Sequence, residues 1–315
     1  MIHILFTGGT ISMRHDASRG GNVPKHGAEE LLALAGVPAG IDCRAEDWAR
    51  APACHLDNGR LGALRSRVRE LTSAPGVTGV VITHGTDVLE ETAYLLARTL
   101  PSAVPVVLTG AMRTADHPAW DGAENLRAAI RVAAEPASAG RGTLVVFGGV
   151  ILDGLEAVKV HANAAGAFAA PHGAPLGRAS AGAVHYEAGV RTRQPIDIER
   201  LDGRVLEVPV IVGDDGGLLD AARPLADAVV LTAFGSGNIP PGSVPAVRRW
   251  LDERKPLVLA SRCPYGEVEP AYAFEGGGAE LVRMGAVPAG ARSSSQARME
   301  LLIALSAGVP YGAGS

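Results

Sequence analysis

The sequence predicts an α/β protein with two domains: a larger N-terminal domain built on a doubly wound, mostly parallel sheet, followed by a smaller α/β domain. Runs of Val, Ile and Leu alternate with helix-like segments, the pattern of a parallel sheet covered by helices on both faces. At 315 residues, 47% of them hydrophobic, the chain exceeds what one hydrophobic core usually organises. The alternation weakens into Gly, Ala and Pro from about Ala164 to Asp202, which predicts the domain boundary there.

The N-terminal domain is predicted to span residues 1–190. Short runs rich in Val, Ile and Thr predict buried strands, expected near Ile2–Phe6, Gly79–Thr83, Val104–Thr109 and Thr143–Phe147. Longer segments with apolar residues at helical spacing lie between them and predict helices near Ala28–Ala35, Leu61–Leu71, Val88–Leu100 and Gly122–Ala134.

A connector is predicted at residues 191–206, because the stretch "TRQPIDIERLDGR" has no apolar period. The alternation then resumes in residues 207–315, which predicts a smaller, Rossmann-like α/β domain. Its strands are expected near Val205–Val212, Ala228–Thr232 and Leu257–Ala260. Its helices are expected near Val244–Glu253, Ala279–Met284 and Ser295–Ala307.

Charge and cysteine usage narrow the functional class. The net charge of -4 comes from 29 basic and 33 acidic residues without long runs, which argues against nucleic-acid or membrane-surface partners and favours a small-molecule partner. Cys43, Cys54 and Cys263 are an odd number without CxxC spacing, so neither a disulfide framework nor a zinc site is expected. No signal-like segment precedes Ile2 and no apolar run reaches membrane-spanning length, and we therefore expect a cytoplasmic protein.

Three glycine-rich polar loops come directly after predicted strands, where open α/β sheets bind their ligands. They read "FTGGTIS", "VITHGTDVLEE" and "VLTGAMRTADHPAWDGAENL". In the first loop, Gly8 and Gly9 allow a close backbone approach or a positive φ and would present Thr10 at the mouth of a crevice. The alternative is an ordinary glycine turn in which Thr10 only caps the next segment.

In the second loop, Asp87 stands three residues before Glu90, the spacing of a capping box, and an apolar run comes next. This spacing predicts that Thr86 and Asp87 lie at a helix N-terminus, which favours a bound carboxylate or a developing oxyanion. The alternative is that Asp87 does nothing except cap the helix.

A nucleophilic threonine requires a group that takes its proton, and a desolvated lysine can do so. The chain contains three lysines, Lys25, Lys159 and Lys255, and Lys159 interrupts the apolar run "AVKV". An exposed lysine at a strand edge is the alternative. A Walker-type phosphate loop, an HExxH motif and a GxSxG elbow are all missing, and the nine histidines show no metal-binding spacing.

The motifs "TGGTIS", "ITHGTDVLEETAYLL" and "TGAMR", in this order, resemble the bacterial-type L-asparaginases and glutaminase-asparaginases. A lysine after the "GTLVVF" strand and a "GxGNxP" loop extend the resemblance over nearly the whole chain. The resemblance implies hydrolysis of the side-chain amide of L-asparagine to L-aspartate and ammonia through a threonine acyl-enzyme. It also implies that no metal or cofactor is needed and that the chain forms a homo-oligomer, a dimer or a tetramer.

The resemblance assigns roles to individual residues. Thr10 matches the nucleophile, and Thr86, Lys159 and Asp87 match a relay in which the lysine draws the proton from Thr86 while the aspartate holds the lysine and grips the substrate's α-amino group. The positions that match substrate-binding residues are Gly9, Gly85, Asp87, Ala111, Ala53 and Asn238.

Two departures from the family pattern concern substrate recognition. The segment after the first strand lacks the family's lid tyrosine, and Gly21 or a neighbour takes its place; Ala53 replaces the serine that holds the substrate carboxylate. An acidic residue supplied by a neighbouring subunit has three candidates, Glu267, Glu269 and Glu275. The alternatives are therefore an amidohydrolase for glutamine or another small amide, or a catalytically weak amino-acid-binding protein.

Overall fold

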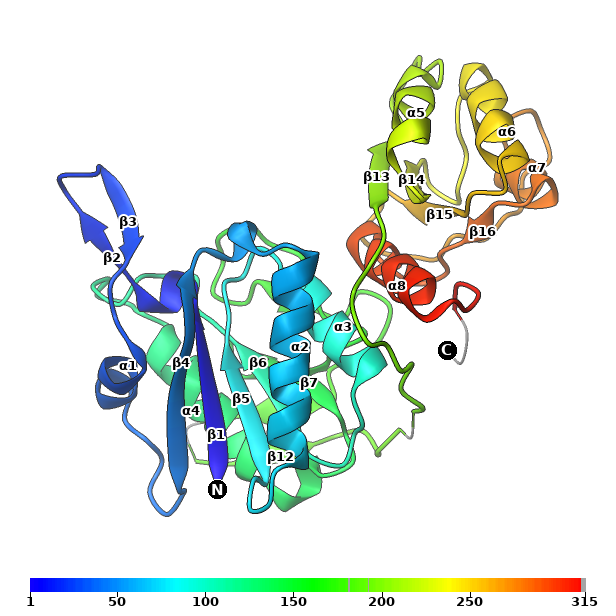
Figure 1. The fold of residues 1–315 in the computed structure, drawn as a ribbon. Coiled ribbons are helices and arrows are strands. Elements are labelled where there is room, and N and C mark those ends of the chain that lie inside the picture. Colours follow the sequence, from blue (N-terminus) through cyan, green and yellow to red (C-terminus); the bar gives the residue numbers. More distant parts are fainter. Residues whose placement is uncertain (181, 192, 313–315) are drawn as a thin grey trace. The chain divides into compact units, whose positions relative to one another are not determined.

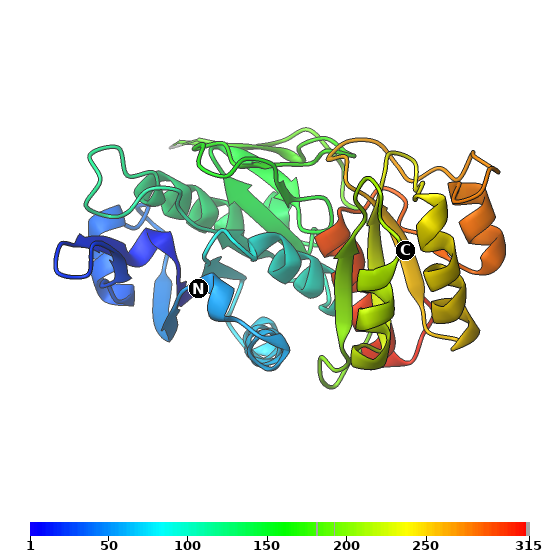
Figure 2. The same ribbon diagram turned by 90° about the horizontal axis from the view of Figure 1, so that it is seen from above.

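The computed structural model describes residues 1–180, 182–191 and 193–312. The chain forms two compact units, Met1–Asp197 and Ile198–Ser315, whose ribbons are drawn in Figure 1 and, turned by 90°, in Figure 2. The division falls inside the segment predicted as the connector. Among the described residues, no helix combines the length and the apolar character required to cross a membrane.

The N-terminal unit is built on an eight-stranded sheet in the order β12-β11-β8-β7-β6-β5-β1-β4. Its parallel strands are β4 Cys43–Ala51, β1 Ile2–Gly8, β5 Gly79–Thr83, β6 Val106–Thr109 and β7 Thr143–Phe147. Antiparallel strands extend it beyond β7, and they are β8 Val150–Asp153, β11 Gly177–Ala179 and β12 Val184–Tyr186. The carboxyl ends of the parallel strands therefore meet at one edge.

Helices cover both faces of this sheet, as Figures 1 and 2 show. The helices α1 Ala28–Ala35 and α4 Gly122–Ala134 pack in one core cluster, and α2 Asn58–Ser73 and α3 Leu89–Thr99 pack in the other. Because successive side chains of a strand point to opposite faces, Ile4 and Phe6 of β1 enter the α1–α4 core while Leu5 enters the α2–α3 core. The predicted doubly wound architecture is confirmed.

The C-terminal unit has a four-stranded, fully parallel sheet, with Trp250 completely buried beside it. The strands are β13 Val205–Pro209, β14 Ala228–Ala233, β15 Leu257–Ser261 and β16 Val287–Pro288. The helices are α5 Gly217–Ala222, α6 Val244–Asp252, α7 Gly278–Met284 and α8 Ser294–Ala307. The side chain of Ser293 caps α8 and forms a reciprocal capping box with Gln296.

The sequence analysis missed several elements and misplaced some ends. The unpredicted elements are the hairpin β2 Met13–Asp16 and β3 Gly21–Pro24, the hairpin β9 Val158–Lys159 and β10 Phe168–Ala169, and β4, β8, β11, β12, α5 and β16. Three of these strands lie in the stretch after Ala164, where the apolar period is weak. The strand predicted to reach Val212 ends at Pro209, and Ile211 and Val212 are exposed.

Candidate active site

The loops after three strands meet through backbone contacts that only glycine permits. Gly9 has a φ of 84°, and a Cβ there would lie 2.5 Å from the backbone nitrogen of Gly85. A Cβ on Gly85 would in turn lie 2.6 Å from the Cβ of Ala53. Distances this short exclude any side chain, so the ends of β1 and β5 and the turn after β4 pack directly on one another.

The loop after β6 joins the same cluster. A Cβ on Gly110 would lie 2.4 Å from the carbonyl oxygen of His84, and the next residue, Ala111, is completely buried. Thr10 comes directly after Gly9 at the start of a short 3-10 turn, Thr10–Ser12, and is half-buried. The turn is fastened because the hydroxyl of Ser12 donates to the Gly9 carbonyl at 2.9 Å.

Lys159 links the two polar residues at the end of β5. Its Nζ donates to Oγ1 of Thr86 at 2.9 Å and lies 3.4 Å from Oδ1 of Asp87. The Lys159 side chain is 19% exposed, whereas that of Asp87 is 62% exposed. The interpretation of Lys159 as an exposed edge lysine is therefore wrong, and the carboxylate of Asp87 is open to a ligand.

The capping-box interpretation of Asp87 and Glu90 is also wrong. Helix α3 begins at Leu89, and its N-cap is Val88, which has no polar side chain. Oε2 of Glu90 accepts a hydrogen bond from the backbone nitrogen of Lys159 at 2.7 Å. The three-residue spacing was compatible with a capping box, but the Glu90 carboxylate binds the backbone of Lys159 and not the start of its own helix.

His84 braces the same loop, a role that the sequence analysis did not assign. Its Nδ1 lies 2.8 Å from the carbonyl oxygen of Gly85, which can only accept, so Nδ1 donates. Its Nε2 lies 3.2 Å from Oγ1 of Thr92 on α3. Burial of the ring lowers the pKa of His84 from 6.5 to about 4. The imidazole is therefore neutral near pH 7 and connects the loop to the helix.

The depressed pKa of His84 predicts acid destabilisation. Between pH 6.5 and about 4 the unfolded chain binds a proton at His84 that the folded chain does not, so the free energy of unfolding falls as the pH is lowered, by about 3 kcal/mol in total. Denaturant unfolding at pH 7 and pH 4.5 should show a smaller loss for His84→Asn, whose amide can still donate to Gly85. Equal losses in the variant and the parent would contradict this origin.

The first turn of α4 holds the third loop in place. The carboxylate of Asp121 accepts from the backbone nitrogens of Met112 at 2.9 Å and Arg113 at 3.0 Å. The amide of Asn125, which is 4% exposed, donates to the Gly110 carbonyl and accepts from the nitrogen of Gly148, both at 3.0 Å. The sequence analysis assigned a role to neither residue, because their partners are backbone atoms 8 to 23 residues away and no local pattern encodes such contacts.

The β2–β3 hairpin corresponds to the segment that lacks a tyrosine. Gly21 pairs with Asp16 at its tip, and a Cβ on Gly21 would have no neighbour within 4 Å among the described residues. The hairpin is tied to the loop after β6, because the backbone nitrogen of His15 donates to Oδ2 of Asp116 at 2.9 Å. Space for a larger side chain therefore exists at Gly21.

Asn238 belongs to the C-terminal unit and holds its own loop. Its Oδ1 accepts from the backbone nitrogen of Gly278 at 3.1 Å. Glu267, Glu269 and Glu275 are exposed in the same unit.

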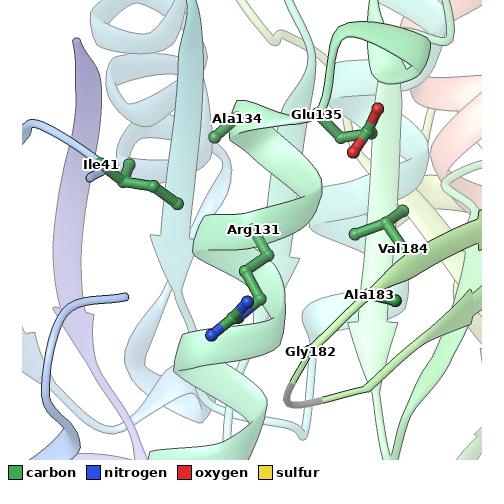
Figure 3. A pocket seen from close by; sticks show the side chains of 7 residues that line it. All are labelled: Ile41, Arg131, Ala134, Glu135, Gly182, Ala183 and Val184. Atoms are coloured by element: carbon green, nitrogen blue, oxygen red, sulfur yellow. The ribbon is translucent and has the colours of Figure 1, made fainter. Parts of the chain in front are cut away.

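A separate pocket lies at the carboxyl end of α4, at the opposite end of that helix from Asp121 and Asn125. Its lining, drawn in Figure 3, comprises Ile41, Arg131, Ala134, Glu135, Gly182, Ala183 and Val184. No residue of the three motifs lines it. In the part of the chain that the structure describes, no group of three or more His, Cys, Asp or Glu side chains is placed to hold a metal ion.

The fold and the loop cluster together define a two-domain α/β protein whose polar side chains Thr86, Asp87 and Lys159 gather at the carboxyl edge of the larger sheet. Comparison with known families identifies the family to which the chain belongs. Residues 1–191 match the N-terminal asparaginase domain, and residues 204–311 match the glutaminase/asparaginase C-terminal domain. The chain belongs to the asparaginase family and is an asparaginase-type amidohydrolase.

Similar proteins match nearly the whole chain. A probable L-asparaginase of Deinococcus radiodurans is 39% identical over 312 residues, covering 97% of this chain and 92% of the relative. An L-asparaginase of Bacillus licheniformis is 28% identical over 305 residues, covering 96% of this chain and 95% of the relative. The crystal structure of a probable cytoplasmic L-asparaginase from Campylobacter jejuni superposes with a TM-score of 0.82 at 28% identity, covering 96% of this chain and 94% of that chain.

Proposed function

We propose that this chain hydrolyses the side-chain amide of L-asparagine to L-aspartate and ammonia, with Thr10 as the nucleophile. The hydroxyl oxygen of Thr10 attacks the amide carbon, the C–N bond breaks, and nitrogen leaves as ammonia with the proton that the hydroxyl gives up. Water then attacks the resulting ester, releasing aspartate and restoring the Thr10 hydroxyl. A probable L-asparaginase at 39% identity and an L-asparaginase at 28% identity support this substrate.

The contact between Lys159 and Thr86 is the observation that carries the proposal. A separation of 2.9 Å between Nζ and Oγ1 allows a proton to pass directly between the two side chains. Through this contact Lys159 draws the proton from Thr86, and Thr86 takes the proton of the attacking group. Asp87, 3.4 Å from Nζ, holds the lysine and binds the α-amino group of the substrate with its exposed carboxylate.

The pocket proposed for the substrate is lined by Gly9, Gly85, Ala53 and Ala111, whose loops pack against one another. Because the two glycines have no side chains, the backbone can lie directly against the ligand. We also propose that Asn238 contributes to substrate binding.

We further propose a cytoplasmic location and a homo-oligomer, a dimer or tetramer, in which Glu267, Glu269 or Glu275 contributes to a neighbouring site. Light scattering at assay concentration tests the oligomer, and a fully active monomer contradicts it.

Ammonia release by the purified protein tests the proposed reaction. The panel comprises L-asparagine, D-asparagine, L-glutamine and simple aspartyl amides. Release from L-asparagine with the highest kcat/KM supports the proposal. Preference for another amide identifies an amidohydrolase with a different substrate, and silence across the panel with retained binding of L-aspartate identifies a binding protein.

Replacing Ala53 by serine should strengthen substrate binding. Ala53 is 5% exposed and packs beside Gly85, at the position where the family places a serine that binds the substrate carboxylate. A charge-assisted hydrogen bond contributes about 1.5–3 kcal/mol, so KM for L-asparagine should fall about 10- to 100-fold in Ala53→Ser. Steady-state kinetics measure this. An unchanged KM, with a folded variant, would mean that other groups hold the carboxylate.

A further inference from the structure

We propose that Glu90 is a positioning residue that holds the main chain of Lys159 and thereby directs its Nζ at Thr86. This inference rests on the proposed function of the Thr86–Lys159–Asp87 cluster. Oε2 of Glu90 accepts from the backbone nitrogen of Lys159 at 2.7 Å, and Glu90 is only 9% exposed. A carboxylate in this setting forms a short, charge-assisted hydrogen bond.

The hairpin that carries Lys159 is too short to fix it alone. Strand β9 consists of Val158 and Lys159, and its ladder with β10 pairs Lys159 with Phe168. In an antiparallel ladder, alternate residues point their N–H groups away from the partner strand. The N–H of Lys159 points to Glu90, whereas that of Val160 returns to the carbonyl of Ala167 at 2.8 Å. The carboxylate therefore takes the place of a neighbouring strand on the outer side of β9.

The short segment 86–90 thus contacts both the side-chain tip and the backbone of Lys159. Thr86 and Asp87 meet its Nζ, and Glu90, on the first turn of α3, meets its backbone nitrogen. The anchor sits on a helix whose first turn is completed by the bond from the Thr92 nitrogen to the Val88 carbonyl at 3.1 Å. Fixing the main chain of a long, flexible lysine restricts where its tip can lie, which is how positioning contributes to catalysis.

The experiment compares Glu90→Ala, which removes the acceptor, with Glu90→Gln, which keeps an oxygen acceptor at the same reach. We expect kcat for L-asparagine to fall about 10- to 100-fold in Glu90→Ala, with KM changed less than about threefold, and most of the kcat to return in Glu90→Gln. The matched control is Glu91→Ala, the adjacent acid in the same turn, which should change kcat less than about twofold. An equal fall in both alanine variants would overturn the inference.

A second measurement does not depend on catalysis. Amide hydrogen exchange, read on a peptide covering residues 158–168, should accelerate in Glu90→Ala and stay as in the parent in Glu91→Ala and Glu90→Gln. Unchanged exchange in Glu90→Ala overturns the inference, whatever the activity. If the parent protein releases no ammonia, the proposed function fails while the exchange data still decide the placement of Lys159. If Glu90→Ala does not fold, Glu90→Leu is measured in its place.

Discussion

Thr10→Ala is expected to lower kcat for ammonia release from L-asparagine by about four orders of magnitude or more, because the acyl-enzyme cannot form. Thr10 begins the 3-10 turn that comes after the Gly9–Gly85 contact, so its position is set by the backbone of its neighbours. Loss of its hydroxyl should therefore leave the loop in place. The measurement is the rate of ammonia release at saturating substrate, with the unfolding temperature recorded for each variant.

Two further variants separate the nucleophile from the scaffold. Thr10→Ser keeps a hydroxyl and should keep part of the activity. Thr7→Val removes a buried hydroxyl on β1, three residues before Thr10, which donates to the Thr83 carbonyl at 2.8 Å. This variant should have a lower unfolding temperature and a kcat within about tenfold of the parent. Ammonia release by Thr10→Ala at the rate of the parent would exclude Thr10 as the nucleophile.

The sequence predicted the parallel strands of the larger sheet because each is a short run of buried Val, Ile, Leu or Thr. It missed β4, because Cys43–Ala51 carries alternating charged residues and lies at the edge of the sheet with only β1 as a neighbour. It missed α5 for a different reason, since six residues, Gly217–Ala222, are too few for a helical period.

The candidate site likewise has features that the sequence indicated and contacts that it did not. Gly8 and Gly9 before Thr10 indicated close backbone approach or a positive φ, and the structure gives each a positive φ and a neighbour that excludes a Cβ. The contact between Lys159 and Thr86 joins residues 73 positions apart, and only the resemblance to a family indicated it. The partners of Glu90 and Asn125 are backbone atoms 69 and 15 residues away, and no local pattern encodes such contacts.

Lys159→Met should lower kcat about 100- to 10,000-fold, the usual contribution of a positioned proton-transfer group. Methionine keeps a similar length but has no Nζ, so Oγ1 of Thr86 and the carboxylate of Asp87 both lose the partner that lies at 2.9 and 3.4 Å. The backbone bond from residue 159 to Glu90 is retained in this variant. A fall in kcat with the main chain still held would assign the effect to the Nζ of Lys159 itself.

The other two lysines of the chain provide matched controls. Lys255 donates to the Arg223 carbonyl in the C-terminal unit, and Lys25 lines a polar surface pocket beside α1. Lys255→Met and Lys25→Met make the same chemical change and should keep kcat within about twofold of the parent. If Lys159→Met does no more than these controls, proton transfer through Thr86 and Lys159 is excluded, and Thr10 must be activated by another group. A loss of activity in Lys159→Met and in neither other lysine variant, together with a smaller loss in Glu90→Ala, would show that Lys159 transfers the proton and that Glu90 positions Lys159.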